Sequence, residues 1–445
     1  MRRLLALPAL LLVIIILAAC GRGDAETTEY DIDYSAQDLS AMQQLDVYVE
    51  ETADARESPY FEPLSSLYIP SGVRVVALGE ATHGSHDFKQ LANDVFKRLV
   101  VDYGFRAFAI EAPLGNNMTI NEYILYGVGT AREAVAQNGF WIHDFQETVD
   151  LVKWMREFNL TAEPGGELRF YGFDIQEINV SLERYLAFMR NVDMAKAIRD
   201  EAHFRLRGIS FAGARNMEKE MLSSRIQDVY GAINEMKQNE EIYVKASSQL
   251  EFDFALRNLF NIKWTLEMQT LREDVDKFWN LRDERMYETI KWIVQQEEKR
   301  GHCRVFVFGH NAHIMRDTFR DLIPVGVHLA AYFGDGYFAI GTEFYQGRFR
   351  AIRMPHMFAT SFVTNDYSGL INKFIGSNID VAVLDVNRHA GKAGSMGEIL
   401  NSEQLMVMIG SVFHPDGNFM IPITPATSYD AIIFVRYSTP AVSVY

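Results

Sequence analysis

The fold is indicated by one stretch of sequence, VRVVALGEATHGSHDFKQLANDVFKRLVVDYGFRAFAIE (residues 73–111). It opens with a nearly continuous apolar run at residues 73–78 and closes with a second at residues 105–110. Between them, over residues 87–103, apolar residues recur at three- and four-residue spacing. Apolar runs without alternation are typical of strands buried on both faces, as in a parallel sheet covered by helices. The stretch therefore predicts a β-α-β unit.

Two more apolar runs, at residues 168–173 and 305–308, extend this pattern, and an amphipathic helix is expected at about 144–158. The fold class predicted is α/β, with a mostly parallel sheet flanked by helices. Residues 165–323 contain no proline, and the helical spacing over 216–237 and 249–298 predicts several long helices. We therefore expect a large helical insertion or lid subdomain at about 178–300.

The sequence after residue 313 has a different pattern. Apolar runs at 337–343 and 348–353, separated by Gln346 and Gly347, predict a hairpin. Further strands are expected at 381–384 and 432–435.

The N-terminus has the pattern of a bacterial lipoprotein signal. Arg2 and Arg3 precede an apolar run at residues 4–19, which ends in small residues just before Cys20. The run is shorter than the roughly 20 residues that a membrane-spanning helix needs. We expect a signal peptide at 1–19, a lipidated Cys20 with a flexible tether over 20–45, and a single domain over 46–445. The expected location is extracytoplasmic, on a bacterial membrane.

Composition limits the partners. The 445 residues include 43 Lys and Arg against 59 Asp and Glu, which is a formal charge of −16. Nucleic-acid binders need clustered basic residues, so nucleic acid is not an expected partner. The only cysteine besides Cys20 is Cys303, which we expect to be a small buried hydrophobe. The chain is expected to be monomeric.

Polar residues follow the predicted strands directly: Glu80, Glu111, Asp174 and His310. In open α/β sheets, ligands bind beyond the carboxyl ends of the strands, so these side chains are expected at one edge. The same edge receives His83, His86 and His313. A neutral imidazole can take a proton from water, and a carboxylate can hold the ring and stabilise its charged form.

Ordinary structural explanations stay open for these residues. Glu80 could cap the following helix, and Glu111 and Asp174 could be loop residues. His310 and His313 could be metal ligands, although HExxH and CxxC are absent and no cofactor is expected. No GxSxG, phosphate-binding loop or dinucleotide fingerprint occurs. No catalytic role is expected for the seven other histidines: His143, His203, His302, His328, His356, His389 and His414.

Five motifs together resemble those of the erythromycin esterase family: LGEATHGSH (78–86), FAIEA (108–112), YGFD (171–174), RDERM (282–286) and GHNAH (309–313). The resemblance runs from about residue 70 to 345. It implies an α/β core with a helical subdomain and hydrolysis of a macrolide lactone-like ester by water, without a covalent nucleophile. The expected partner is thus a small-molecule ester or lactone.

The resemblance also implies roles for residues. His83 would be the general base, with Glu80 and Glu111 in its catalytic cluster. His310 and His313 would bind or polarise the reacting carbonyl. The residues expected on the substrate-binding side are Asp174, Arg282, Asp283 and His86.

One position departs from the family. Its members usually carry a basic residue nine positions after the base histidine, where this chain has Ala92, and the nearest basic residues are Lys89 and Lys97. Two alternative functions therefore stay open: a metal-dependent hydrolase that uses the same histidines and acids, and a non-catalytic ligand-binding lipoprotein of the cell envelope.

Overall fold

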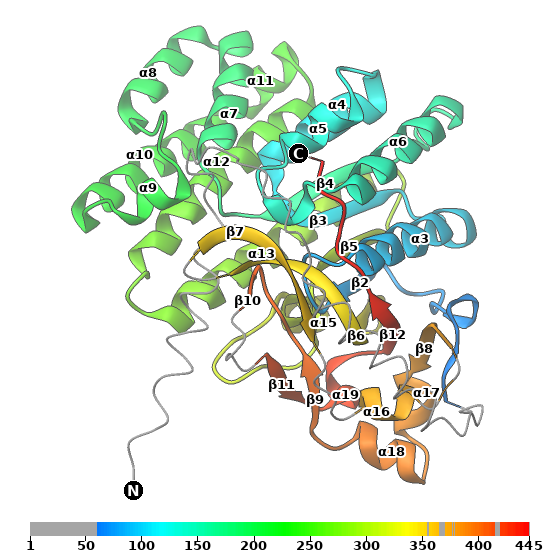
Figure 1. The fold of residues 1–445 in the computed structure, drawn as a ribbon. Coiled ribbons are helices and arrows are strands. Elements are labelled where there is room, and N and C mark those ends of the chain that lie inside the picture. The colour runs from blue at the N-terminus through cyan, green and yellow to red at the C-terminus, as the bar shows by residue number, and fades with distance from the viewer. Residues whose placement is uncertain are drawn as a thin grey trace, which may run out of the picture.

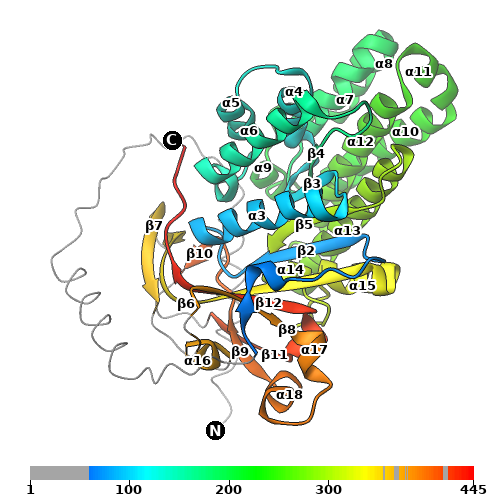
Figure 2. The same cartoon turned by 90° about the vertical axis from the view of Figure 1, so that its right-hand side faces the viewer.

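The computed structural model describes residues 60–353, 356–364, 370–375, 377, 379–413 and 419–444. Within these residues ten strands form one sheet, whose main path runs β1-β8-β12-β6-β2-β5-β3-β4. Figures 1 and 2 show helices on both faces of this sheet. The predicted signal peptide, Cys20 and tether lie outside the described residues.

Four parallel strands form the half of the sheet that carries the site: β2 (Val75–Glu80), β5 (Val305–His310), β3 (Ala107–Pro113) and β4 (Arg169–Asp174). Nearly every residue in them is buried, because helices cover both faces. All four strands were predicted, and the α/β class is confirmed. The register places Glu80 directly opposite His310, at the carboxyl ends of β2 and β5.

Alternate side chains of these strands enter two separate apolar cores. Val76, Leu78 and Phe308 pack on one face, beneath the helices α3 (His86–Tyr103), α4 (Leu114–Tyr126), α5 (Ala131–Ala136) and α6 (Gln146–Thr161). Val75 and Val307 pack on the other, against α13 (Val275–Lys299), α14 (Asn311–Ile314) and α15 (Val325–Phe333).

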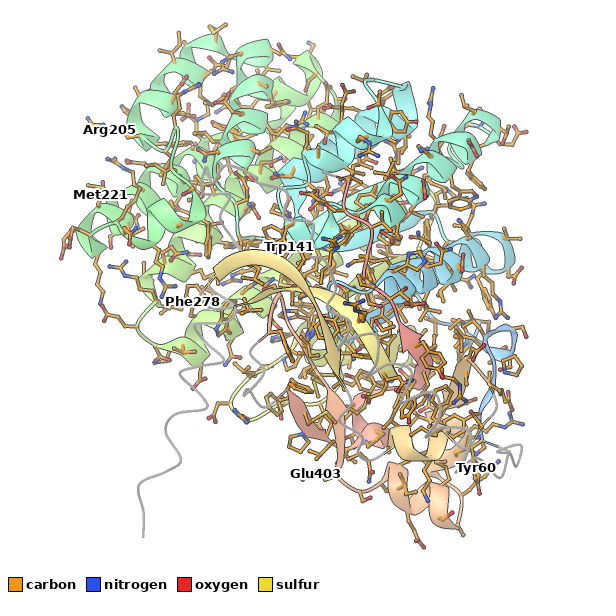
Figure 3. The ribbon with its side chains drawn as sticks, in the orientation of Figure 1. Tyr60, Trp141, Arg205, Met221, Phe278 and Glu403 are labelled. Atoms are coloured by element: carbon orange, nitrogen blue, oxygen red, sulfur yellow. The ribbon has the colours of Figure 1, made fainter. Side chains whose placement is uncertain are left out.

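Residues 179–299 are helical apart from short connections. The helices that precede α13 are α7 (Asn179–Val192), α8 (Met194–Phe204), α9 (Phe211–Arg215), α10 (Lys219–Gln238), α11 (Glu240–Ala246) and α12 (Gln249–Thr270). They enclose an apolar core of their own, which includes Leu186, Ile233 and Leu259. Figure 3 shows Arg205 and Met221 at the outer edge of this helical part, far from Glu403 and Tyr60. No helix in the described residues is long and apolar enough to span a membrane.

The hairpin expected around Gln346 and Gly347 is wrong. Residues Tyr337–Arg353 form one continuous strand, β6, and its antiparallel partner is β7 (His356–Thr364). Gly347 instead lets β6 pass close to a neighbouring strand: it has φ +138°, and a Cβ there would lie 2.1 Å from the carbonyl oxygen of Ser438. The glycine signal marks this close approach rather than a turn.

The remaining elements follow β7. The strands are β8 (Val381–Asp385), β9 (Gln404–Val407), β10 (Val412–Phe413), β11 (Met420–Ile423) and β12 (Ala431–Ser438), with β1 (Glu62–Pro63) antiparallel to β8. The short helices are α16 (Leu370–Ile375), α17 (Val386–Ala390), α18 (Ser395–Leu400) and α19 (Pro425–Ser428). Single turns of 3-10 helix lie at Leu64–Ser66, Trp141–His143 and Gly334–Gly336. Cys303 is exposed rather than buried, because β5 begins only at Val305.

Candidate active site

His83 lies just beyond the carboxyl end of β2, paired with the acid that ends this strand. Its Nδ1 is 2.8 Å from Glu80 Oε1. Glu80 also accepts hydrogen bonds of 3.0 and 2.8 Å from Lys89 Nζ. Both partners of this ion pair are buried. When Nδ1–H donates to a carboxylate, Nε2 is left as the proton acceptor, so the pairing selects the tautomer that a general base needs.

Glu80 does not cap the helix that follows. Ser85 is the N-cap of α3, and its hydroxyl accepts the backbone N–H of Phe88 at 3.4 Å. The carboxylate of Glu80 therefore bonds to His83 and Lys89 instead of the helix N-terminus.

Lys89 supplies a positive charge close to the position where the resemblance predicts one. Lys89 and Ala92 lie three residues apart on α3, so they share one helix face. Ala92 is buried in the apolar core above the sheet. Sequence reasoning named Lys89 only as a nearby basic residue, because nothing in the spacing shows that its ammonium reaches Glu80.

Glu111, in β3, connects the two sides of the site. Its Oε2 accepts the backbone N–H of His310 at 2.8 Å, and its Oε1 accepts Arg282 Nη2 at 2.9 Å. Burial opposes its charge, but His313 and Arg282 hold the pKa of Glu111 well below its usual range. Behind it, the fully buried His143 donates from Nε2 to the Glu111 backbone carbonyl at 2.9 Å.

Arg282 projects from α13 into this cluster. It binds Asp174 through two hydrogen bonds, Nε to Oδ1 at 3.2 Å and Nη2 to Oδ2 at 2.6 Å. Asp174 is fully buried, and Arg282 is 3% exposed. Paired contacts of this kind fix the plane of the guanidinium.

His313, on α14, lies between two carboxylates. Its Nδ1 is 2.9 Å from Asp283 Oδ2, and its Nε2 is 3.3 Å from Glu111 Oε1. Burial disfavours the charged ring, but Asp283 and Glu111 raise the pKa of His313 to about 10. The ring is therefore an imidazolium at neutral pH. Arg282 Nη1 lies 3.0 Å from the same Nε2, so two positively charged side chains meet at this point of the cavity.

His310 has both ring nitrogens engaged by the backbone. Nδ1 accepts the N–H of Ala312 at 3.3 Å, and Nε2 lies 3.1 Å from the carbonyl oxygen of Ile409. Burial, and then the neighbouring His83, lower the pKa of His310 to about 3. The ring is neutral, and neither nitrogen is available to a substrate carbonyl, which differs from the role that the resemblance implies.

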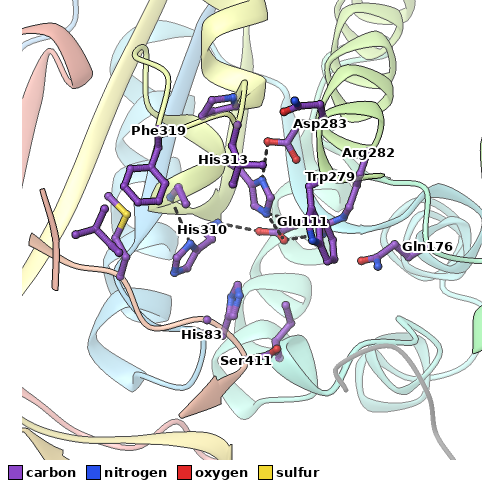
Figure 4. Close-up of a pocket in the computed structure, with 18 of the residues that line it drawn as sticks. His83, Glu111, Gln176, Trp279, Arg282, Asp283, His310, His313, Phe319 and Ser411 are labelled. Carbon is purple, nitrogen blue, oxygen red and sulfur yellow. Dashed lines mark hydrogen bonds and ion pairs between the residues drawn. The ribbon is translucent and has the colours of Figure 1, made fainter. Parts of the chain in front are cut away.

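These side chains surround a cavity of about 150 Å³ (Figure 4). The predicted residues that line it are His83, Glu111, Arg282, Asp283, His310 and His313. The apolar wall includes Phe140, Ile142, Trp279, Phe319, Leu322 and Met408, and polar groups come from Gln176, Asn280 and Ser411. Sequence reasoning did not single out these nine residues, because nothing in their local pattern distinguishes them from core or loop residues.

The C-terminal part of the cavity wall is attached directly to the His83 loop. Ile409 donates its backbone N–H to the carbonyl oxygen of Ala81 at 2.8 Å and pairs with Thr82 in an isolated parallel bridge. Met408 and Ser411, on either side, line the cavity. The chain after residue 400 thus completes the site.

Three of the predicted site residues do not line the cavity. Glu80 and Asp174 lie behind His83 and Arg282, and each holds its neighbour in place. The prediction that Asp174 contacts substrate is therefore corrected to a supporting position. His86 is also corrected: it begins α3, and its Nδ1 is 2.5 Å from Glu147 Oε1 on α6, away from the cavity.

In the part of the chain that the structure describes, no group of three or more His, Cys, Asp and Glu side chains is arranged to hold a metal ion. The acids and imidazoles of the cavity pair instead with one another and with Arg282 and Lys89.

The family model for erythromycin esterase matches residues 100–438. The chain belongs to the erythromycin esterase family. The match starts within α3 and ends at the last residue of β12, so it includes the C-terminal wall of the cavity, beyond the part that the motifs covered. Membership makes this family member a hydrolase of the esterase type.

Two curated proteins are similar in sequence to this erythromycin esterase family member. "Erythromycin esterase type II" of Escherichia coli is 26% identical over 325 residues, which are 66% of this chain and 73% of that protein. "Putative hydrolase YbfO" of Bacillus subtilis (strain 168) is 23% identical over 265 residues, 56% of this chain and 57% of that protein.

Solved structures share its fold. A protein from Bacillus cereus superposes with a TM-score of 0.74 at 21% identity, covering 91% of this chain and 99% of that one. A succinoglycan biosynthesis protein has a TM-score of 0.73 at 19% identity with the same coverages, 91% and 99%. A mutant of the erythromycin esterase EreC, in its open conformation, has a TM-score of 0.64 at 16% identity, covering 84% and 93%.

Proposed function

We propose that this protein hydrolyses the ester bond of a macrolide lactone or a similar ester with a water molecule activated by His83. The observation that carries the proposal is the chain of contacts from Lys89 through Glu80 to His83, which faces the cavity. The family description and the name of the Escherichia coli relative support the substrate class.

In the proposed reaction, Nε2 of His83 takes a proton from water while the water oxygen attacks the ester carbonyl carbon. The imidazolium that forms is stabilised by Glu80. When the tetrahedral intermediate collapses, the bond to the alcohol oxygen breaks, and that oxygen takes the proton back from His83. The products are an acid and an alcohol, joined in one molecule when the substrate is a lactone.

The charged side chains around the cavity nearly balance one another. Four acids lie in or directly behind the cavity: Glu80, Glu111, Asp174 and Asp283. Against them stand three cations, Lys89, Arg282 and the imidazolium of His313. Apart from His83, these side chains together carry one formal negative charge.

The carbonyl oxygen gains negative charge during the attack and needs donors that are already in place. Arg282 and His313 line the cavity, and both are positively charged at neutral pH. We assign the electrostatic stabilisation of this oxygen to the positive charges of these two side chains. His310 has a positioning role, because its ring nitrogens are occupied by the backbone.

We also propose that the protein acts outside the cytoplasm, anchored to a bacterial membrane by a lipid on Cys20. The support is the pattern of residues 1–20. A Cys20→Ala variant should fail to incorporate a labelled fatty acid that the wild type incorporates.

The catalytic proposal is tested with His83→Asn in the full chain, against macrolides and simple esters, with a mass gain of one water as the readout. Turnover should fall by at least about a hundredfold. The matched control is His86→Asn, three residues away and outside the cavity, which should keep its activity. A His83→Asn variant that retains full turnover would refute the assignment.

Metal dependence is tested by dialysis of the same wild-type protein against a chelator. The rate should stay unchanged, because the cavity side chains are engaged with each other and with cations. Loss of activity that added Zn²⁺ restores would favour the metal-dependent alternative.

A further inference from the structure

The side chain of Gln176 is buried at the cavity without a partner for its amide nitrogen. Gln176 follows β4 by two residues, is 4% exposed and lines the cavity. Its Nε2 is enclosed and has no hydrogen-bond partner among the described residues. Buried polar groups are nearly always hydrogen-bonded, so an unpartnered donor at a cavity indicates a ligand group. Figure 4 shows the amide end of Gln176 facing the cluster around Arg282.

Hydrogen bonds hold the backbone around Gln176, and this fixes the position from which its side chain extends toward the cavity. Its N–H donates to Asp174 Oδ1 at 3.2 Å, the same oxygen that accepts Arg282 Nε at 3.2 Å. On the other side, the N–H of Glu177 donates to the carbonyl oxygen of Ile175 at 2.8 Å. One carboxylate therefore places both Gln176 and the guanidinium that we assign to the reacting carbonyl.

The rest of the lining indicates the chemistry of the ligand. The charged groups of the cavity are paired: Glu111 with Arg282, and Asp283 with His313. Apolar side chains also line the cavity, among them Trp279, Phe319 and Met408. A cavity with paired charges, an apolar wall and a free amide suits a neutral, largely apolar molecule with a polar group at one point.

We propose that Gln176 is a substrate-binding residue that recognises a hydroxyl group on a neutral, largely apolar ester. A hydroxyl is the smallest neutral group that can both accept from Nε2–H and donate to the amide oxygen. That the ligand is an ester rests on the proposed function. The binding of a hydroxylated ligand by Gln176 does not, because it can be measured without any turnover.

The test therefore uses ligands that are not esters. Affinities of the full chain are measured by isothermal titration for N-phenylbutanamide and for its 2-, 3- and 4-hydroxy derivatives. The wild type should bind at least one hydroxy derivative about tenfold more tightly than the parent amide. Gln176→Met, of similar length without the amide, should lose this preference and bind the parent within about twofold of wild type. The control Ser411→Ala, at another polar residue that lines the cavity, should keep the preference for the hydroxy derivative.

Three results would overturn the inference: no hydroxyl preference in the wild type, an unchanged preference in Gln176→Met, or no binding of any of the four amides. Hydrolysis of the corresponding p-nitrophenyl esters is measured in parallel. Hydroxyl-dependent binding without ester hydrolysis would contradict the proposed function and leave the role of Gln176 intact. Ester hydrolysis together with an unchanged hydroxyl preference in Gln176→Met would support the proposed function and contradict the role of Gln176.

Discussion

Lys89 Nζ contacts both carboxylate oxygens of Glu80, at 3.0 and 2.8 Å, in a pair of which neither member is more than 3% exposed. Glu80 in turn holds Nδ1 of His83. A cation expected at Ala92 is therefore supplied one turn earlier on the same helix. The alternative of a non-catalytic binding protein was favoured by the missing basic residue at Ala92, and Lys89 supplies that charge.

Replacing Lys89 by Met should lower turnover by about tenfold or more, because the buried Glu80 would lose its cation and hold His83 less well. Removing one partner of a buried pair typically costs about 3–5 kcal/mol of stability. Steady-state kinetics and urea unfolding measure the two effects. Lys97→Met is the matched control: Lys97 lies on the same helix and packs over the Trp154 ring, so its loss should leave turnover unchanged. Equal effects in both variants would contradict the role of Lys89.

Arg282→Met should destabilise the fold by about 3–5 kcal/mol, because Asp174 and Glu111 would both remain buried without their common cation. Arg285 is the comparison, since it lies on the same helix, is more exposed and pairs only with Glu284 at 3.3 Å among the described ion pairs. Its change to Met should cost less than about 1 kcal/mol. Urea unfolding midpoints of the two variants and the wild type measure these losses of stability, and equal losses in both variants would contradict the role of Arg282.

The pH dependence of stability should show the charged ring of His313. Its pKa is about 10 in the folded protein, against an ordinary value of 6.5, so the folded state binds more protons between these values. The stabilisation is complete below pH 6.5 and falls as the pH rises toward 10, by at most about 1.4 kcal/mol per pH unit. In His313→Gln this slope should be absent from unfolding curves measured between pH 8.5 and 10, above the range in which Glu343, with a pKa of about 8, contributes. A slope that persists would show that another group causes it.

Glu343→Gln should stabilise the protein at neutral pH. Glu343 is 1% exposed, Oε1 accepts the Val407 N–H at 3.0 Å, and burial raises its pKa to about 8. Because the folded pKa is the higher one, stability is lost as the pH rises from 4.5 to 8. A neutral amide of the same shape does not lose this stability, so the free energy of unfolding of the variant should exceed that of the wild type by up to about 3 kcal/mol at pH 7. The variant and wild type should melt together at pH 4, and a variant less stable than wild type at pH 7 would refute the explanation.

Much of the site's location follows from local sequence. Apolar runs without alternation indicate strands covered on both faces, and parallel strands end at the same edge. Glu80, Glu111 and His310, each at the end of such a run, could therefore be expected to meet, and they do. Helical spacing likewise indicated α3, α6 and the long helices after residue 178.

What each of these side chains does was decided by contacts between distant parts of the chain. Asp174 proves to be the anchor of Arg282, 108 positions later. His310 is kept neutral by burial and by the neighbouring His83, and its Nε2 is held by the carbonyl oxygen of Ile409, 99 positions later. The single strand β6 replaces an expected hairpin because Gly347 must pass close to Ser438. Sequence patterns report whether a residue faces the core or the edge of a sheet. They carry no information on how helices dock or how distant strands align, and these decide which charge meets which carboxylate.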